Sequence, residues 1–144
     1  MKELGFETKA VRLQSQQTHQ KEHSVPLYLT SSFTFDDAAE GAAIFAGEAD
    51  GNLYSRFSNP NTDEFANKIA ALEGVESAVA TASGMNAIFT TFAAHLKAGD
   101  HVISAQAIFG NSTYILNTIL PQWGIECTFV DAREPEQWEK AVRP

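Results

Sequence analysis

The spacing of apolar and polar positions becomes regular from about residue 59 onward. Phe65 is followed at i+4 and i+7 by Ile69 and Leu72, a spacing that predicts a helix with one buried face. An Asn-x-x-Glu capping box beginning at Asn61 is predicted to start this helix, and Gly74 to end it.

Strand-like and helix-like segments then alternate along the chain. Strands are predicted at residues 76–82, 100–105 and 125–131, and helices at residues 85–96, 112–120 and 134–142. Alternation at this spacing is typical of βαβ units, whose strands are parallel and whose crossovers are right-handed. The predicted fold class is therefore α/β with a mainly parallel sheet.

Residues 1–58 do not share this regular pattern. The segment is polar at residues 14–23, apolar and extended at residues 25–30, and predicted to form a short helix capped by Asp36. It offers little material for a core of its own. We therefore expect residues 1–58 to form an N-terminal arm that packs on another domain or subunit, and residues 59–144 to form the first part of an incomplete α/β domain.

Composition narrows the classes of protein that fit. Hydrophobic residues make up 44% and charged residues 19% of the chain, as in a globular domain, and the net charge of −8 argues against nucleic acid as a partner. A single cysteine, Cys127, excludes an internal disulfide and fits a reducing cytoplasm. The pattern predicts neither a membrane-spanning helix nor a secretory signal.

The turn at Ser83-Gly84-Met85 carries the first candidate chemistry, because it connects a predicted strand to a predicted helix. Free backbone N–H groups and the helix dipole favour a bound anion at such a turn, typically phosphate, and glycine lets the backbone approach closely. Many strand-to-helix turns contain serine and glycine without binding anything, and this one matches neither GxGxxG nor a P-loop. Both interpretations stay open from the turn alone.

Tyr54, Arg56 and Phe109 are the other candidates. Tyr54 and Arg56 lie at i and i+2 of a segment expected to be extended, so their side chains should point the same way. Arginine suits bidentate phosphate contacts and tyrosine adds a neutral donor, although a surface arginine beside a half-buried tyrosine is the plainer alternative. Phe109 follows the second predicted strand, where its ring is placed either to stack on a planar ligand or to fill the core.

The remaining reactive side chains predict no site. His19 and His23 are spaced i, i+4 but lack a third metal ligand nearby. Cys127 alternates within a predicted strand as a small core residue, and Ser83 does not lie in a G-x-S-x-G elbow.

Taken in order, these residues resemble the Cys/Met-metabolism family of pyridoxal-phosphate-dependent enzymes. The resemblance covers nearly the whole chain and is carried by residues 25–33, Tyr54-Ser55-Arg56 with Asn59-Pro60, Leu72-Glu73-Gly74, Ser83-Gly84-Met85, Gly99-Asp100-His101-Val102 and Phe109-Gly110. It implies the large domain of the aspartate-aminotransferase-like fold (fold type I), preceded by the arm.

The resemblance also implies a role for each candidate residue. Gly84 and Met85 would donate backbone N–H groups to the phosphate of pyridoxal 5'-phosphate, and Phe109 would stack on its pyridine ring. Tyr54 and Arg56 would reach the phosphate bound in the neighbouring subunit. The implied assembly is a homo-oligomer, a dimer of active dimers.

Two departures from the family pattern bear on the reaction. The family usually has tyrosine at the position of Phe109, and phenylalanine is typical of sequences resembling O-succinylhomoserine sulfhydrylases. This implies γ-replacement on an O-acylhomoserine, with O-succinylhomoserine and sulfide giving homocysteine in methionine biosynthesis. Cystathionine γ-synthase, with cysteine as sulfur donor, and cystathionine or methionine γ-lyase are the alternatives. The family's usual threonine after Asn-Pro is Asn61 here, which we interpret as a tolerated change at a helix cap.

No lysine of the chain lies in the family's Ser-x-Thr-Lys context, which carries the Schiff base to the cofactor. We therefore expect the 144 residues alone to be catalytically inactive. A non-catalytic phosphate-binding module and a purely structural fragment are the alternatives of another class.

Overall fold

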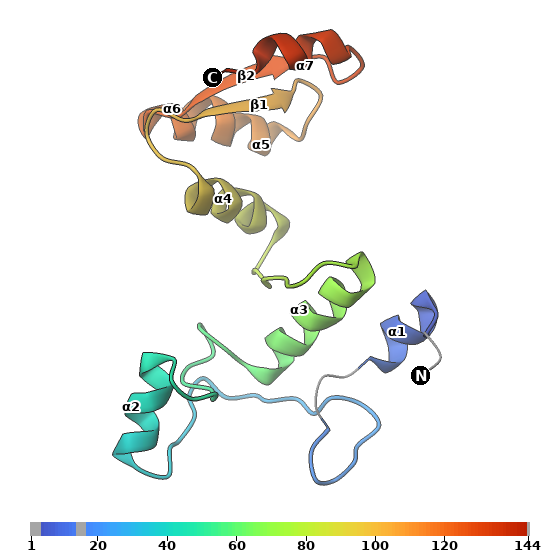
Figure 1. The fold of residues 1–144 in the computed structure, drawn as a ribbon, viewed down its shortest axis with the longest axis vertical. Helices are drawn as coiled ribbons and strands as arrows, with labels where there is room; N and C mark the ends of the chain where they lie inside the picture. Colours follow the sequence, from blue (N-terminus) through green and yellow to red (C-terminus); the bar gives the residue numbers. More distant parts are fainter. Residues whose placement is uncertain (1–3, 14–16, 144) are drawn as a thin grey trace. The chain divides into compact units, whose positions relative to one another are not determined.

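The computed structural model describes residues 4–13 and 17–143 (Figure 1). Residues 14–16, part of the polar stretch predicted in the arm, lie outside the described residues. The chain divides into two compact units, Met1–Ala80 and Thr81–Pro144. The functional division at residue 58, between an arm and a domain, stays a prediction.

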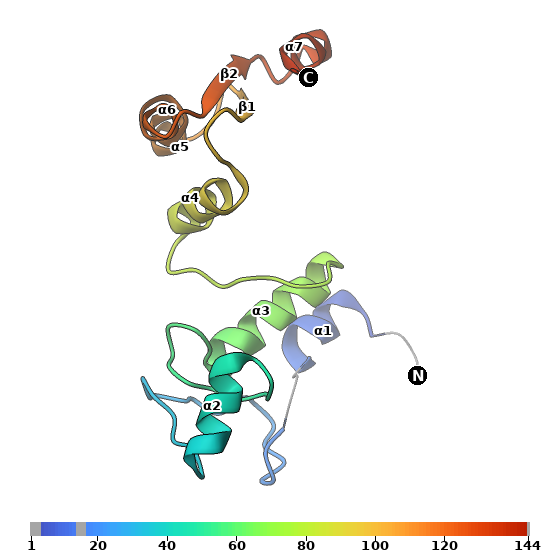
Figure 2. The ribbon, with the colours of Figure 1, turned by 60° about the vertical axis from the view of Figure 1, so that its left-hand side comes forward.

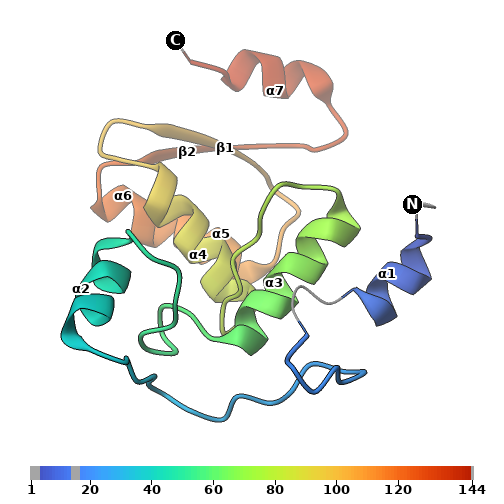
Figure 3. The ribbon, with the colours of Figure 1, turned by 60° about the horizontal axis from the view of Figure 1, so that its bottom comes forward.

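The described part of the first unit contains the helices α1 (Phe6–Arg12), α2 (Ala38–Ala46) and α3 (Pro60–Glu73). Helix α1 packs beside α3, as Figures 2 and 3 show. An isolated antiparallel bridge between Ser32 and Tyr54 joins the extended segments on either side of α2. Among the described residues of this unit, the buried hydrophobic side chains are the small ones of Ala66 and Ala70. The unit therefore depends on polar contacts between its segments.

Helix α3 begins differently from the prediction. Its N-cap is Asn59, whose Oδ1 accepts a hydrogen bond from the backbone N–H of Asn61 at 2.9 Å. The predicted capping role of Asn61 is wrong, because its side chain bonds instead to the backbone of Pro26 and Tyr28. The helix ends at Gly74 as predicted, with a φ of 70° that glycine adopts readily.

Helix α2, in contrast, begins one residue later than predicted. Asp37, not Asp36, is its N-cap, and the Asp37 Oδ1 accepts from the backbone N–H of Glu40 at 2.8 Å. The Glu40 carboxylate accepts in turn from the backbone N–H of Asp36 at 2.5 Å. The side chain of Asp37 and the backbone of Asp36 therefore both take part in capping α2, each through Glu40.

The second unit has a sheet between helices. It contains α4 (Gly84–His95), β1 (His101–Ala105), a continuous helical segment made of α5 (Gly110–Tyr114), η1 (Ile115–Ile119) and α6 (Leu120–Gln122), then β2 (Glu126–Val130) and α7 (Pro135–Ala141). Strands β1 and β2 pair in parallel, with His101 opposite Glu126 and Ala105 opposite Val130. The helical segment lies on one face of the sheet and α7 on the other (Figures 1 and 2). The predicted α/β class with parallel strands is confirmed.

The strand predicted at residues 76–82 is wrong. None of these residues is assigned to a strand, and the described sheet has two strands rather than three. The side chain of Val79 is 86% exposed. A β-strand needs a neighbouring strand for its backbone hydrogen bonds, and none of the described segments pairs with this one. The apolar composition of residues 76–82 is therefore not sufficient to predict a strand.

The helix predicted at residues 112–120 begins earlier, at Gly110, and changes hydrogen-bonding pattern within its length. Its middle, η1, is a π-helix, in which the N–H of Leu120 reaches back five residues to the carbonyl of Ile115. Pro121 follows immediately and has no N–H to donate to a carbonyl one turn earlier. The wider turn accommodates a proline that would obstruct a regular α-helix.

A single apolar cluster holds the second unit together. Its buried members come from the helical segment and the residue just before β2: Ile115, Leu116, Leu120 and Ile125. Partly buried side chains from α4 and its C-cap, both strands and the loop after β1 pack against them: Met85, Ile88, Phe89, Phe92, Leu96, Val102, Ile108, Cys127 and Phe129. Burying one large aliphatic side chain stabilises the fold by about 1.5–3 kcal/mol, so this cluster is the main stabilising feature of the unit.

A matched pair of valines tests the burial of side chains in the second unit. Val130 is 2% exposed at the end of β2, whereas Val142 is 67% exposed after α7. We expect V130A to lower the free energy of unfolding by about 2 kcal/mol, because it removes buried methyl groups and leaves a cavity. V142A should change it by less than about 0.5 kcal/mol. Urea denaturation of the two variants measures both values, and equal losses would contradict this difference in burial.

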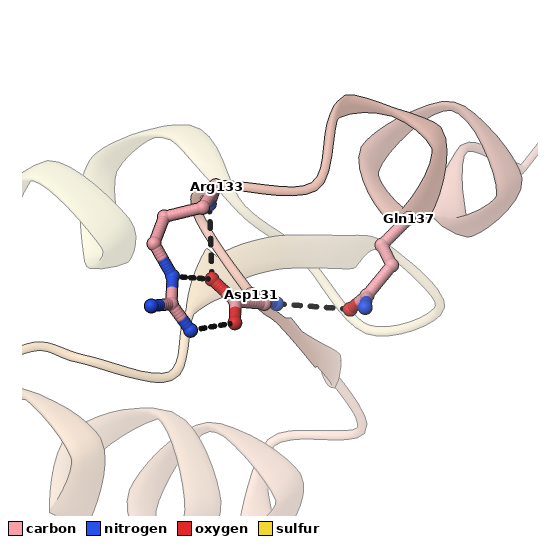
Figure 4. Close-up of polar contacts among 3 residues, drawn as sticks. All are labelled: Asp131, Arg133 and Gln137. Carbon is pink, nitrogen blue, oxygen red and sulfur yellow. Dashed lines mark hydrogen bonds and ion pairs between the residues drawn. The ribbon is translucent and has the colours of Figure 1, made fainter.

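The loop after β2 is fixed by Asp131 (Figure 4). Its carboxylate accepts from the Arg133 guanidinium at 3.0 and 2.7 Å and from the Arg133 backbone N–H at 3.0 Å. The Asp131 N–H donates to Oε1 of Gln137 on α7 at 2.9 Å. The side-chain hydrogen bonds from Arg133, then that from its backbone, hold the pKa of Asp131 below its ordinary value by stabilising the charged form.

Removing the arginine tests this contact. Because the pKa of Asp131 is lowered in the folded state, the contact stabilises above the unfolded pKa and is lost as pH falls through the folded pKa. We expect R133A to raise the pKa of Asp131 toward its ordinary value, as measured by carboxyl-carbon NMR titration. R143A is the control, since Arg143 pairs with Glu126 and lowers the pKa of that residue instead. An Asp131 pKa unchanged by R133A is the contradicting outcome.

Candidate functional site

The turn at Ser83 leaves two backbone donors available. Ser83 is the N-cap of α4, and its Oγ accepts from the N–H of Asn86 at 3.1 Å. The N–H groups of Gly84 and Met85 have no acceptor in the described part of the chain. They lie in the first turn of a helix of 12 residues, at the positive end of its dipole.

Gly84 keeps this turn open. The residue is exposed, and a Cβ placed on it would meet no atom within 4 Å. A group that bonds to the Gly84 and Met85 amides can therefore approach the backbone closely. The arrangement suits a compact anion with several acceptor oxygens, such as a phosphate.

Phe109 presents its ring to solvent. It precedes α5 after the carboxyl end of β1 and is 66% exposed, so it is not a core side chain. Its carbonyl accepts from the N–H groups of Ser112 and Thr113 at 2.9 and 3.1 Å, which fixes the backbone at this residue. An exposed ring on a fixed backbone is suited to stacking on a planar ligand.

The turn at Gly84 and the ring of Phe109 belong to one packed body. Met85 beside the turn and Ile108 beside the ring both pack against the cluster of Ile115, Leu116, Leu120 and Ile125. The core of the second unit therefore sets the position of both candidate contacts.

Tyr54 and Arg56 lie in the first unit. The expectation that they occupy an extended segment is wrong, because residues 54–57 form a turn in which the N–H of Phe57 donates to the Tyr54 carbonyl at 2.8 Å. The turn is attached to the segment before α2 by Ser55, whose N–H donates to the Ser31 carbonyl at 2.9 Å. The Ser55 Oγ donates to the Thr30 carbonyl at 2.6 Å.

The turn brings Tyr54 and Arg56 together by ring contacts. The guanidinium carbon of Arg56 lies 5.5 Å from the Tyr54 ring centroid and 4.8 Å from that of Phe57. Both are cation–π distances. Arg56 forms no ion pair with a carboxylate among residues 4–13 and 17–143. Its N–H donors therefore remain available to an anion from outside the chain, as do the two amides of the second unit.

The other reactive side chains have structural surroundings. Nε2 of His101 lies 2.7 Å from Oγ1 of Thr128, across the sheet. Burial raises the pKa of the Cys127 thiol, which disfavours a reactive thiolate. In the described residues no group of three His, Cys, Asp or Glu side chains is arranged to hold a metal, and no helix has the length and apolar character needed to cross a membrane.

One hollow of the described chain lies away from the candidate residues. It has a volume of about 360 Å³ and is lined by residues of α1, α3 and the segment between them, including Arg12, His23 and Lys68. None of the five candidate residues lines it. Arg56 lines a second hollow of about 280 Å³, together with Ser55, Phe57 and residues of α3 and of the segment 78–80.

A family profile and individual relatives of known name agree on one family for this chain. The profile of the family described as "Cys/Met metabolism PLP-dependent enzyme" matches residues 7–144. An O-succinylhomoserine sulfhydrylase from Pseudomonas aeruginosa is 42% identical over 140 residues, covering 97% of this chain and 35% of the relative. An L-methionine γ-lyase from Porphyromonas gingivalis is 42% identical over 121 residues, covering 84% of this chain and 30% of the relative.

Solved structures agree. A crystal structure described as an O-acetylhomoserine (thiol)-lyase from Campylobacter jejuni, with N'-pyridoxyl-lysine-5'-monophosphate, superposes with a TM-score of 0.91 at 30% identity. It covers 98% of this chain, which covers 35% of that one. Cystathionine γ-lyase from Lactobacillus plantarum, complexed with L-serine, gives a TM-score of 0.85 at 30% identity, and this chain covers 35% of it.

The chain spans about a third of the length of these relatives. Its fold is that of the N-terminal portion of the fold type I pyridoxal-phosphate enzymes, as predicted. The family's cofactor is pyridoxal 5'-phosphate. The chain belongs to the Cys/Met metabolism family of PLP-dependent enzymes.

Proposed function

We propose that the full-length protein catalyses γ-replacement on an O-acylhomoserine, converting O-succinylhomoserine and sulfide to homocysteine in methionine biosynthesis. Relatives called O-succinylhomoserine sulfhydrylase, from Pseudomonas aeruginosa and Mycobacterium tuberculosis, support this proposal at 42% and 41% identity. Phe109 is the single observation in the chain that carries it, because a phenyl ring can stack but has no proton to transfer. We place this reaction in the cytoplasm.

The turn at Gly84 fits the phosphate of the cofactor. The Gly84 and Met85 amides have no acceptor among the described residues, and the space beside Gly84 is open. In the proposal these amides bind the phosphate oxygens and the dipole of α4 favours their charge. The exposed ring of Phe109 would stack on the pyridine ring. When bound, pyridoxal phosphate supplies an electron sink for departure of the acyl group from Cγ.

Tyr54 and Arg56 complete the phosphate site from the neighbouring subunit in this proposal. The uncompensated charge of Arg56 and its contacts with two aromatic rings support the assignment. Each subunit of an active dimer then binds the phosphate with its own Gly84 turn and contributes Arg56 to its partner's cofactor. A homo-oligomer, formed from such dimers, is therefore part of the proposal.

γ-Elimination is the second candidate, because the L-methionine γ-lyase from Porphyromonas gingivalis is equally identical, at 42%. In that reaction no sulfur nucleophile adds after the γ-substituent leaves. Cystathionine γ-synthase chemistry differs only in the nucleophile, cysteine in place of sulfide. In this proposal the lack of a phenol at position 109 favours replacement over an elimination that uses a phenol.

The reaction itself is the first test. Full-length protein loaded with pyridoxal phosphate should form homocysteine from O-succinylhomoserine and sulfide, and should release little methanethiol from methionine. F109Y should increase γ-elimination relative to replacement, because it supplies a proton-transferring phenol. Mass spectrometry of the products measures both reactions. Efficient methanethiol release by the unaltered protein would establish the lyase alternative and overturn the proposal.

The phosphate contact is the second test. R56A should weaken binding of pyridoxal phosphate by about 10- to 100-fold, the loss expected for a hydrogen bond to a charged group. Pyridoxal, which lacks the phosphate, should bind R56A and the unaltered protein equally well. Equilibrium dialysis with each compound measures the two dissociation constants. R143A removes a surface arginine paired with Glu126 and serves as the control. Unaltered phosphate binding in R56A would contradict the role of Arg56.

A further inference from the structure

Asn61 holds a separate segment of chain against the start of α3. Its Oδ1 accepts from the N–H of Tyr28 at 2.7 Å, and its Nδ2 donates to the carbonyl of Pro26 at 2.6 Å. One carboxamide thus bonds to the backbone of two residues at i and i+2, as a neighbouring strand would. Threonine, the family's usual residue, would have to donate and accept through a single hydroxyl oxygen, whereas the carboxamide of Asn61 uses two separate atoms for the two bonds.

Asn59 continues the same contact toward the turn that carries Arg56. It is buried, with 7% of its surface exposed. Its Nδ2 donates to the Tyr28 carbonyl at 3.2 Å and to Ser55 Oγ at 2.9 Å. Its Oδ1 accepts from the N–H of Asn61 at 2.9 Å, so the two asparagines are themselves linked.

The contact reaches the turn through Ser55, whose Oγ accepts from Asn59 and donates to the Thr30 carbonyl at 2.6 Å. Ser55 stands between Tyr54 and Arg56. The segment 26–30, the turn 54–57 and the first residues of α3 are therefore joined by one series of hydrogen bonds. The buried hydrophobic side chains among the described residues of this unit are alanines, so these bonds restrain the turn together with the backbone bond from Ser55 to Ser31.

We propose that Asn59 and Asn61 are positioning residues for Arg56: their linked carboxamides fix the 54–57 turn so that the guanidinium is held ready for the cofactor phosphate. This inference rests on the proposed function, which assigns Arg56 to the phosphate. From the sequence, asparagine in place of the usual threonine at position 61 was interpreted as a tolerated change at a helix cap. The inference instead gives Asn61 a role in positioning Arg56.

The experiment uses full-length protein and the dialysis assay with pyridoxal phosphate and pyridoxal. N61A should weaken binding of pyridoxal phosphate about 3- to 10-fold, the change expected from losing one or two neutral hydrogen bonds, and leave pyridoxal binding unchanged. N61D keeps the acceptor for Tyr28 but loses the donor to Pro26, and should weaken binding as well. N117A, at an exposed position of η1, is the control.

The double variant N61A/R56A identifies the route of the effect. If Asn61 acts by positioning Arg56, N61A should have little further effect on phosphate binding once Arg56 is removed. The inference is overturned if N61A weakens binding of pyridoxal phosphate as much in the R56A background as in the unaltered protein. It is also overturned if N61A weakens binding of pyridoxal equally, or if N61A leaves binding of pyridoxal phosphate unchanged. If R56A alone has no effect, the assignment of Arg56 to the phosphate fails first. If R56A weakens binding and N61A does not, only the present inference fails.

Discussion

The packing of the helical segment 110–122 against β2 is the contact on which the second unit depends. Leu116, Leu120 and Ile125 are its most buried side chains, and α4 and both strands pack around them. Because Met85 and Ile108 belong to the same packing, the core determines where the Gly84 amides and the Phe109 ring lie. A loosened core would disturb both candidate cofactor contacts without altering either residue.

The first unit is organised on another principle. Where the structure describes this unit, its buried hydrophobic side chains are alanines, and side-chain amides and hydroxyls bonded to the backbone join its segments. Such bonds are directional, and each contributes modestly to stability. They are well suited to fixing the geometry of a turn, and less suited to stabilising a unit that is separated from its neighbours.

Local patterns in the sequence predicted the second unit well. β1, β2 and α4 lie within about one residue of their predicted bounds, because periodicity, a helix cap and glycine or proline at the ends act over short distances. The strand predicted at residues 76–82 failed because strand pairing depends on a partner that local composition does not reveal. The π-helical turn before Pro121 was also unforeseen, since a proline is more often read as a helix end.

The candidate site shows the same contrast between features that local sequence predicts and features that depend on contacts between distant residues. The amides at Gly84 and Met85 follow from the predicted helix that begins after Ser83, although no strand is assigned before it. The place of Phe109 after β1 was predicted, but the exposure of its ring was left open by the sequence. The turn at residues 54–57 and the bonds of Asn61 do not follow from local sequence, because both join residues whose relation is set by the three-dimensional fold. Asn61 bonds to residues more than thirty positions earlier, which no capping rule considers. The family resemblance located Arg56 without predicting how its side chain is held.

The contact of Arg56 with two rings has an entropic consequence. A free arginine side chain loses about 2 kcal/mol of rotamer entropy when it becomes fixed. Stacking on Tyr54 and Phe57 restricts those rotamers in the absence of any anion. An anion that binds the guanidinium therefore orders less of the side chain itself, and more of the contact energy remains as affinity. The two aromatic rings thus preorganise a charge that they do not neutralise.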